Sequence, residues 1–187
     1  MNGHCYEFRR AMNPDLELPA IALALAAAAA VCDVRQGRIP NWLTFPGILS
    51  GVALRGLLLG WKGAGSAVLG CLLAGGVFLL FYLVRAMGAG DVKLAAAIGS
   101  MLGPADAVVM LLATALCGGG LAIVYAVYRH RIRATVMNLG AVLRFHAWAG
   151  MQAHPELNLD NPVALRMPYG LAIAAGTLYV FLAVWWR

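Results

Sequence analysis

The chain has 187 residues, of which 62% are hydrophobic and 12% are charged, and its mean hydropathy is +0.78. Soluble domains are on average about 45–50% apolar and about 25% charged, so a water-soluble globule of this size could not bury so much apolar surface. Disordered chains are poor in apolar residues, which excludes disorder. The net charge of +6 fits basic cytoplasmic loops. The sequence lacks the basic stripe with interleaved aromatic residues that would indicate nucleic-acid binding. The composition predicts an integral membrane protein.

Apolar ranges follow one another along most of the chain. A helix that spans a bilayer needs about 20 mainly apolar residues. The sequence predicts an all-α, polytopic membrane bundle of about six helices, over residues 18–34, 42–59, 64–87, 91–102, 105–128 and 167–186. Within the long connection 129–166, residues 136–151 form a weakly amphipathic stretch suited to the membrane interface. We expect one integral-membrane domain over residues 1–187.

The first apolar range has a second interpretation, a cleaved signal peptide, because Arg9 and Arg10 precede it. Asp15 and Glu17 lie between this basic pair and the apolar run, which is unusual for a signal peptide, so we expect a retained helix. The four cysteines form no CxxC pair and the four histidines show no ligand spacing. We therefore expect no metal site and no redox dithiol.

The basic residues predict the orientation. If the N-terminus lies outside, nine of the 14 Lys and Arg residues fall on the inner side and five on the outer side. Basic residues are enriched in cytoplasmic loops. The connections after the first, third and fifth helices are therefore expected in the cytoplasm, although Arg9 and Arg10 argue mildly against this orientation.

Three acidic residues lie in the membrane-spanning body, namely Asp33, Asp91 and Asp106. A carboxylate near lipid is costly, so each needs a physical reason. Asp106 follows Gly103–Pro104 at the start of the fifth helix, where an acid stabilises free N–H groups and the helix dipole. We interpret Asp106 as a structural cap at the outer surface.

Asp33 and Asp91 lie at the cytoplasmic ends of their helices in this orientation. Two carboxylates at similar depth, 58 positions apart in sequence, can face each other across a bundle and share a proton. One can then act as a base toward water and the other as an acid toward a peptide. The alternative is that each aspartate pairs with a nearby cation, Asp33 with Arg35 and Asp91 with Lys93. Spacing alone leaves both interpretations open.

Gly88 and Gly90 stand directly before Asp91, at the junction of two apolar ranges. Glycine permits backbone angles closed to other residues and lets another chain approach the backbone closely. Irregular backbone at membrane depth is tolerated where it lines a cavity or is buried in protein. The sequence therefore predicts a turn that directs Asp91 inward and admits a substrate strand, with either property of glycine as the reason.

Three ordered motifs carry a family resemblance. Gly88-Ala89-Gly90-Asp91, followed by Lys93, resembles the GxGD motif of intramembrane aspartic proteases. Residues 33–41, D-V-R-Q-G-R-I-P-N, resemble the D-x-R-x-x-x-I-P-N segment of the type IV prepilin peptidases. Pro168-Tyr169-Gly170 is similar to the P-[YF]-G segment that opens the last helix of that family.

The resemblance implies an aspartic endopeptidase of the bacterial inner membrane that removes the leader of type IV prepilins and pseudopilins at the cytoplasmic face. It implies Asp33 and Asp91 as catalytic residues and needs no cofactor. It also implies supporting or substrate-binding roles for further matched positions: Gly88, Gly90, Lys93, Arg35, Pro40, Asn41, Pro168, Tyr169 and Gly170. Asn41 is a candidate N-cap of the second helix, and Pro168 fits the first turn of the sixth.

Many members of that family carry an N-terminal segment with paired CxxC motifs that accompanies N-methylation of the cleaved pilin. This sequence has no CxxC motif, so it resembles the short branch found with tight-adherence (Tad/Flp) pili. Archaeal preflagellin peptidases are an alternative subfamily. The competing function class is a small carrier that uses Asp33 and Asp91 as a proton relay. Transporters often contain internal repeats, and none is found here.

Overall fold

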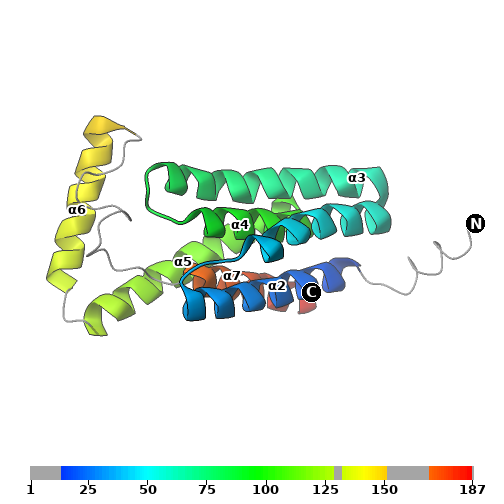
Figure 1. The fold of residues 1–187 in the computed structure, drawn as a ribbon, viewed down its shortest axis with the longest axis horizontal. Coiled ribbons are helices and arrows are strands. Elements are labelled where there is room, and N and C mark those ends of the chain that lie inside the picture. The colour runs from blue at the N-terminus through cyan, green and yellow to red at the C-terminus, as the bar shows by residue number, and fades with distance from the viewer. Residues whose placement is uncertain (1–13, 129–131, 151–168, 187) are drawn as a thin grey trace, which may run out of the picture.

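The computed structural model describes residues 14–128, 132–150 and 169–186, and within these ranges the chain forms helices and no strands. The helices are α2 (Pro14–Gln36), α3 (Asn41–Leu83), α4 (Ala89–Leu102), α5 (Pro104–Tyr128), α6 (Ile132–Ala149) and α7 (Tyr169–Trp185). Five of them run alongside one another, while α6 lies across one end of the bundle (Figure 1). The predicted all-α membrane bundle is therefore confirmed.

Helix α3 contains two of the expected helices in one continuous hairpin. They meet at Gly60, whose φ of 70° and ψ of −160° are not helical. Figure 1 shows the two halves running antiparallel. A left-handed φ is costly for residues that carry a Cβ, which explains why one glycine makes the turn. The break is shorter than the expected gap between residues 59 and 64, and α3 ends at Leu83 rather than at residue 87.

The turn between α4 and α5 is equally short. Gly103 ends α4 with a φ of 79°, and its N–H donates to the carbonyl of Gly99 at 2.9 Å. Pro104 begins α5, where its fixed φ suits a helix and its missing N–H costs nothing. The expected stop at Gly103–Pro104 is present, and α5 therefore returns toward the end of the bundle where α4 begins (Figure 1).

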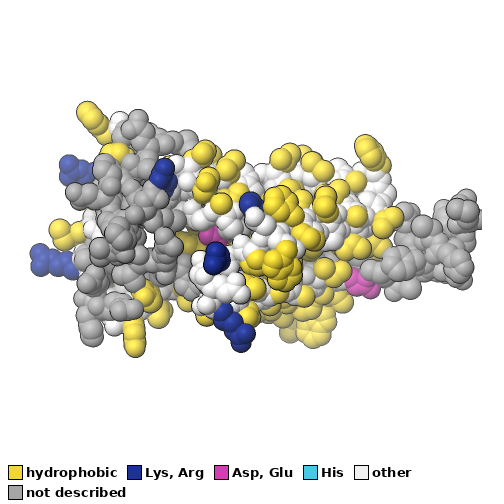
Figure 2. All heavy atoms as spheres, in the orientation of Figure 1, with side chains coloured by type: hydrophobic (Ala, Val, Ile, Leu, Met, Phe, Trp, Pro, Cys, Tyr) yellow, Lys and Arg dark blue, Asp and Glu magenta, His cyan; other side chains and the backbone are white. Residues whose placement is uncertain are grey.

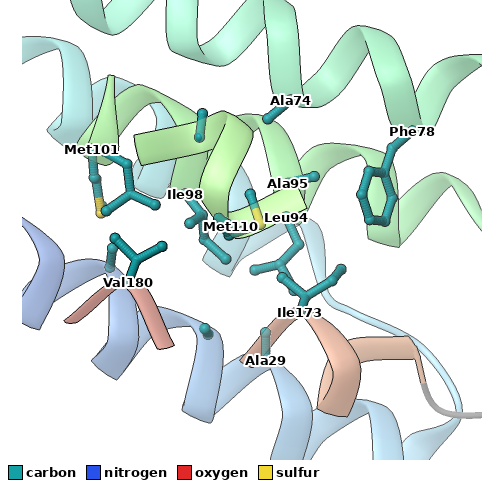
Figure 3. Close-up of a cluster of buried hydrophobic side chains, with 14 of the residues drawn as sticks. Ala29, Ala74, Phe78, Leu94, Ala95, Ile98, Met101, Met110, Ile173 and Val180 are labelled. Carbon is teal, nitrogen blue, oxygen red and sulfur yellow. The ribbon is translucent and has the colours of Figure 1, made fainter. Parts of the chain in front are cut away.

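Helix α4 is the centre of the bundle, because every residue from Leu94 to Leu102 is buried. Its neighbours are α2, α3, α5 and α7. Figure 3 shows Leu94, Ile98 and Met101 of α4 meeting side chains from these helices, among them Ile173 of α7. Small residues allow close packing in membrane bundles.

One contact between α3 and α4 depends on such small residues. A Cβ added to Gly70 would collide with the carbonyl oxygen of Gly99, and a Cβ added to Gly99 would collide with that of Gly70. The two backbones therefore touch at a site where neither helix can carry a side chain. This contact fixes how deeply α4 lies against α3.

The outer surface fits lipid. Helices α2, α3 and α5 are long and apolar enough to cross a membrane, and α7 is a shorter apolar helix. Large hydrophobic side chains such as Leu72 and Leu116 are exposed, and hydrophobic atoms cover much of the face in Figure 2. A soluble protein rarely exposes so large an apolar surface. The chain is a membrane protein, and the number and direction of its crossings remain predictions.

Candidate active site at one end of the bundle

The fold brings Asp33 and Asp91 to the same end of the bundle. Asp33 lies in the last turn of α2, and Asp91 lies in the first turn of α4. Both side chains are partly buried, and the charge of Asp33 acts on the Asp91 carboxyl. Tyr169, the first residue of α7, is also near enough for the charge of Asp91 to act on it. Three segments that are distant in sequence thus meet around two carboxyl groups.

Asp33 is held by the start of α7. The backbone N–H of Gly170 donates a hydrogen bond to Oδ2 of Asp33 at 2.9 Å. A helix N-terminus stabilises an anion, and this offsets the unfavourable position of Asp33 at the C-terminal end of its own helix.

The same contact explains the glycine at position 170. A Cβ there would lie 3.0 Å from Oδ2 of Asp33 and 3.2 Å from the Cα of Ala30. Both distances are tighter than ordinary van der Waals contacts. Gly170 therefore lets the start of α7 approach the Asp33 carboxyl.

Asp91 is held by its own turn. The N–H of Gly88 donates to Oδ2 of Asp91 at 3.2 Å, and the N–H of Asp91 donates to the carbonyl of Gly88 at 3.2 Å. The Asp91 carboxylate thus caps Gly88, the N-cap of α4, and the bond in return goes to the Gly88 carbonyl because glycine has no side chain. The two bonds orient the Asp91 carboxyl before any substrate is present.

The two glycines before Asp91 do not serve as positive-φ residues. Gly88 has a φ of −81°, and Gly90 is not among the glycines with positive φ. A Cβ on Gly90 would instead lie 3.1 Å from the Cβ of Ile39 and 3.5 Å from its backbone nitrogen. Of the two reasons that the sequence left open, special backbone angles are therefore wrong for Gly88 and Gly90. Gly90 admits the chain's own segment after α2, at the position where a substrate strand was expected.

Lys93 connects the segment that contains Asp91 to the segment that begins at Asp33. Its ammonium donates to Oδ1 of Asn41 at 2.8 Å and lies 5.2 Å from the centre of the Phe45 ring. The groups that act on Asp91 are Asp33 and the Gly88 backbone, so the described part of the chain does not support the alternative in which Lys93 neutralises Asp91. The N-cap of α3 is Pro40 rather than Asn41. Asn41 begins the helix and uses its side chain to accept from Lys93.

The structure does not place the remaining predicted positions in contact with the carboxyl pair. Arg35 is exposed in the last turn of α2, and the hydrogen bond found for Asp33 comes from Gly170, not from Arg35. Pro168 lies outside the described residues. Among the described residues, no group of three or more His, Cys, Asp or Glu side chains could hold a metal ion.

The opposite end of the bundle contains a residue that the sequence analysis overlooked. Arg55 of α3 donates through Nη1 to the carbonyl of Met101 at 2.9 Å, while its buried Nε has no partner. The charges of Asp106 and Asp15 act on Arg55, and Asp106 lies in the first turn of α5 as expected. The sequence did contain a signal for this site, because Arg55 is a lone arginine inside the apolar range 42–59. A charged residue within a membrane segment is costly unless it has partners.

Comparison with known proteins adds one finding. The model of the type IV leader peptidase family matches residues 20–123, a range that contains Asp33, Asn41, Asp91 and Lys93. No curated protein and no solved structure matches the chain. The match covers more than half of the chain and ends before Tyr169 and Gly170.

Proposed function

Because the chain belongs to the type IV leader peptidase family, we propose that it is an aspartic endopeptidase embedded in the bacterial inner membrane. Its substrates are type IV prepilins of the Flp-like class and related pseudopilin precursors. It removes their leader peptides at the cytoplasmic face. The observation that carries the proposal is the meeting of Asp33 and Asp91, each anchored by a glycine N–H, within the part of the chain that the family model covers.

The arrangement supports peptide hydrolysis by two carboxyl groups. Two carboxyl groups that act on each other electrostatically favour a state in which the pair holds one proton. The ionised carboxylate takes a proton from water, whose oxygen attacks the scissile carbonyl carbon, while the protonated carboxyl donates to the carbonyl oxygen. The proton taken from water then passes to the leaving amine as the C–N bond breaks, and the second carboxylate takes back its proton from the former carbonyl oxygen, which restores the pair.

The backbone hydrogen bonds to the two carboxyl groups support these roles as base and acid. They engage the Oδ2 atoms of Asp33 and Asp91, so neither bond occupies an Oδ1 atom, and in this proposal the Oδ1 atoms act on water and substrate. Rigid anchoring of this kind lowers the entropic cost of reaching the reactive geometry. The main-chain donors belong to Gly170 and Gly88, so both glycine motifs contribute to the same pair.

The proposed cytoplasmic placement is supported by charge. The site lies at the end of the bundle that holds the connections after the first, third and fifth expected helices. These connections carry most of the basic residues of the chain, and basic loops favour the cytoplasm. The Flp-like substrate class rests on the sequence resemblance.

The test is co-expression with a tagged Flp-type prepilin, followed by a mobility assay for loss of the leader. Asp33→Asn and Asp91→Asn should each abolish cleavage, because the two carboxyls act as one unit. Asp106→Asn is the matched control at the far end and should retain activity. Membrane insertion and thermal unfolding of each variant separate loss of chemistry from loss of fold. Near-normal cleavage by either single variant would contradict the proposal.

A further inference from the structure

The connection between α2 and α3 is in contact with both turns that carry the carboxyl pair. It consists of residues 37–40, because α2 ends at Gln36 and α3 begins at Asn41. In Figure 1 it lies at the end of the bundle where α4 begins. A short connection at this place can fix how the last turn of α2 and the first turn of α4 lie relative to each other.

Gly37 holds the connection to the turn of Asp33. Its N–H donates to the carbonyl of Asp33 at 2.8 Å, and its φ is 64°. A left-handed residue directly after a helix, with its N–H bonded to the carbonyl four residues earlier, is a common way to end a helix. Asp33 is therefore anchored twice, through its carbonyl by Gly37 and through its carboxyl by Gly170.

Ile39 holds the connection to the turn of Asp91. Its side chain is 7% exposed and belongs to the buried core. It lies against Gly90, where an added Cβ would be 3.1 Å from the Cβ of Ile39 and 3.5 Å from its backbone nitrogen and oxygen. Only one residue separates Ile39 from Gly37, so the connection has little slack between its two contacts.

The glycine at position 37 has a backbone reason and no packing reason. A Cβ there would meet nothing within 4 Å, but residues that carry a Cβ disfavour its left-handed φ. Without this turn α2 would continue, and each further helical residue rotates the chain by about 100° and advances it by about 1.5 Å. Such a change would move Ile39 away from Gly90.

We propose that Gly37 is a positioning residue for the carboxyl pair, because its left-handed turn joins the backbone of Asp33 to the segment that packs on Gly90. The turn thereby sets the separation and relative direction of the Asp33 and Asp91 side chains. Gly37 has no side chain to offer to a substrate and acts only through the placement of the aspartates. This role rests on the proposed peptidase function, whereas the link between the two turns is a property of the fold.

The first experiment measures kcat and KM for one prepilin with the variants Gly37→Ala, Gly37→Asn and Gly60→Ala. Gly60 is the matched control, because it also has a positive φ, 70°, and open space at its Cβ position. It forms the turn within α3, at the opposite end of the bundle. Each rate is divided by the amount of folded protein, and thermal unfolding measures the stability of each variant.

Gly37→Ala should lower kcat by about fivefold or more and leave KM unchanged, since the penalty for a left-handed Cβ changes the population of the turn by about 5- to 30-fold. Gly37→Asn should recover most of the rate, because asparagine adopts this φ more readily than alanine. Gly60→Ala should lose stability and keep its kcat. Equal kcat values for Gly37→Ala and Gly60→Ala would overturn the proposal, as would a Gly37→Asn variant that is as slow as Gly37→Ala.

A second experiment needs no cleavage. The native cysteines are first replaced by alanine, at positions 5, 32, 71 and 117. Asp33→Cys and Asp91→Cys are then combined in one protein and treated with a short thiol cross-linker. Adding Gly37→Ala should slow the cross-link by about fivefold, and adding Gly60→Ala should not.

The cross-linking rate separates this inference from the peptidase proposal. An unchanged rate with Gly37→Ala would overturn the positioning role even if the parent protein cleaves prepilin. A parent protein that does not cleave, but whose cross-link is slowed by Gly37→Ala, would contradict the proposed function and leave the link between the two turns confirmed.

Discussion

The ammonium nitrogen of Lys93 lies 2.8 Å from the side-chain oxygen of Asn41, and this hydrogen bond joins the beginning of α4 to the beginning of α3. Lys93 is two residues beyond Asp91, and Asn41 ends the segment that begins at Asp33. The bond therefore ties together the two chain segments that carry the carboxyl pair. Its position suggests a positioning role rather than neutralisation of either aspartate.

A double-mutant cycle tests this role. Lys93→Met and Asn41→Ala should each lower the cleavage rate by about fivefold, the equivalent of a hydrogen bond worth about 1 kcal/mol. The double variant should be no slower than either single variant, because both remove the same interaction. Lys62→Met, a change at an exposed lysine near the Gly60 turn, is the control and should cleave normally. Losses that multiply in the double variant would show that Lys93 and Asn41 act independently.

Arg55 is expected to stabilise the fold without taking part in catalysis. Arg55→Met removes the donor to the Met101 carbonyl and the charge that Asp15 and Asp106 face. We expect the free energy of unfolding to fall by about 1–3 kcal/mol, the usual cost of losing a charged hydrogen-bond partner. Thermal unfolding in detergent measures the loss, and the cleavage rate per folded molecule should stay unchanged. An unchanged melting temperature would contradict this role.

The orientation is testable by cysteine labelling from outside the cell. In a variant without native cysteines, Lys62→Cys should react with a membrane-impermeant maleimide, while Arg38→Cys should react only after permeabilisation. Both side chains are exposed and lie at opposite ends of the bundle. Gly63 is unsuitable as a label site, because a Cβ there would collide with the carbonyl of Arg55. The reverse labelling pattern would place Asp33 and Asp91 on the outer side.

Local patterns in the sequence account for the helices and for the end of the bundle where the aspartates lie. Apolar ranges and glycine or proline breaks are local signals, so the sequence predicted the stop at Gly103–Pro104 and a gap between residues 59 and 64, but not the tight turn at Gly60. Apart from the approach of Asp33 and Asp91, contacts between distant segments were not predictable. The bond from Lys93 to Asn41 and that from Arg55 to Met101 depend on how α3 and α4 pack, which no spacing in the sequence reports.

The role of the motif glycines was also not predictable from the sequence. Gly90 could have served an unusual backbone angle or a close approach, and sequence alone does not separate them. The structure assigns close approach to Ile39 at Gly90 and to Asp33 at Gly170, whereas a Cβ on Gly88 would make an ordinary contact at 3.4 Å from Oδ2 of Asp91. The three glycines therefore predict a graded series of alanine variants.

Gly170→Ala should be the most harmful of the three. The added methyl group meets Asp33 at 3.0 Å on one side and the Ala30 backbone at 3.2 Å on the other, so the carboxyl must move. A misplacement of about 1 Å can cost about 100-fold in rate, and we expect a loss of about 10- to 100-fold. Gly90→Ala should cost less, about tenfold at most, because its closest contact is 3.1 Å, so the chain at Ile39 has to move by only a few tenths of an ångström. Gly88→Ala should cleave at close to the normal rate.

The measurement is the initial cleavage rate of one prepilin, normalised to the amount of each variant in the membrane. Gly119→Ala is the matched control, since a Cβ there meets nothing within 4 Å. Substitution of a helical glycine by alanine generally favours the helix, so the control should fold at least as well as the parent protein. A rate for Gly88→Ala as low as that for Gly170→Ala would show that the glycines act through something other than the approach distances. A normal rate for Gly170→Ala would remove the anchoring of Asp33 by α7 from the mechanism.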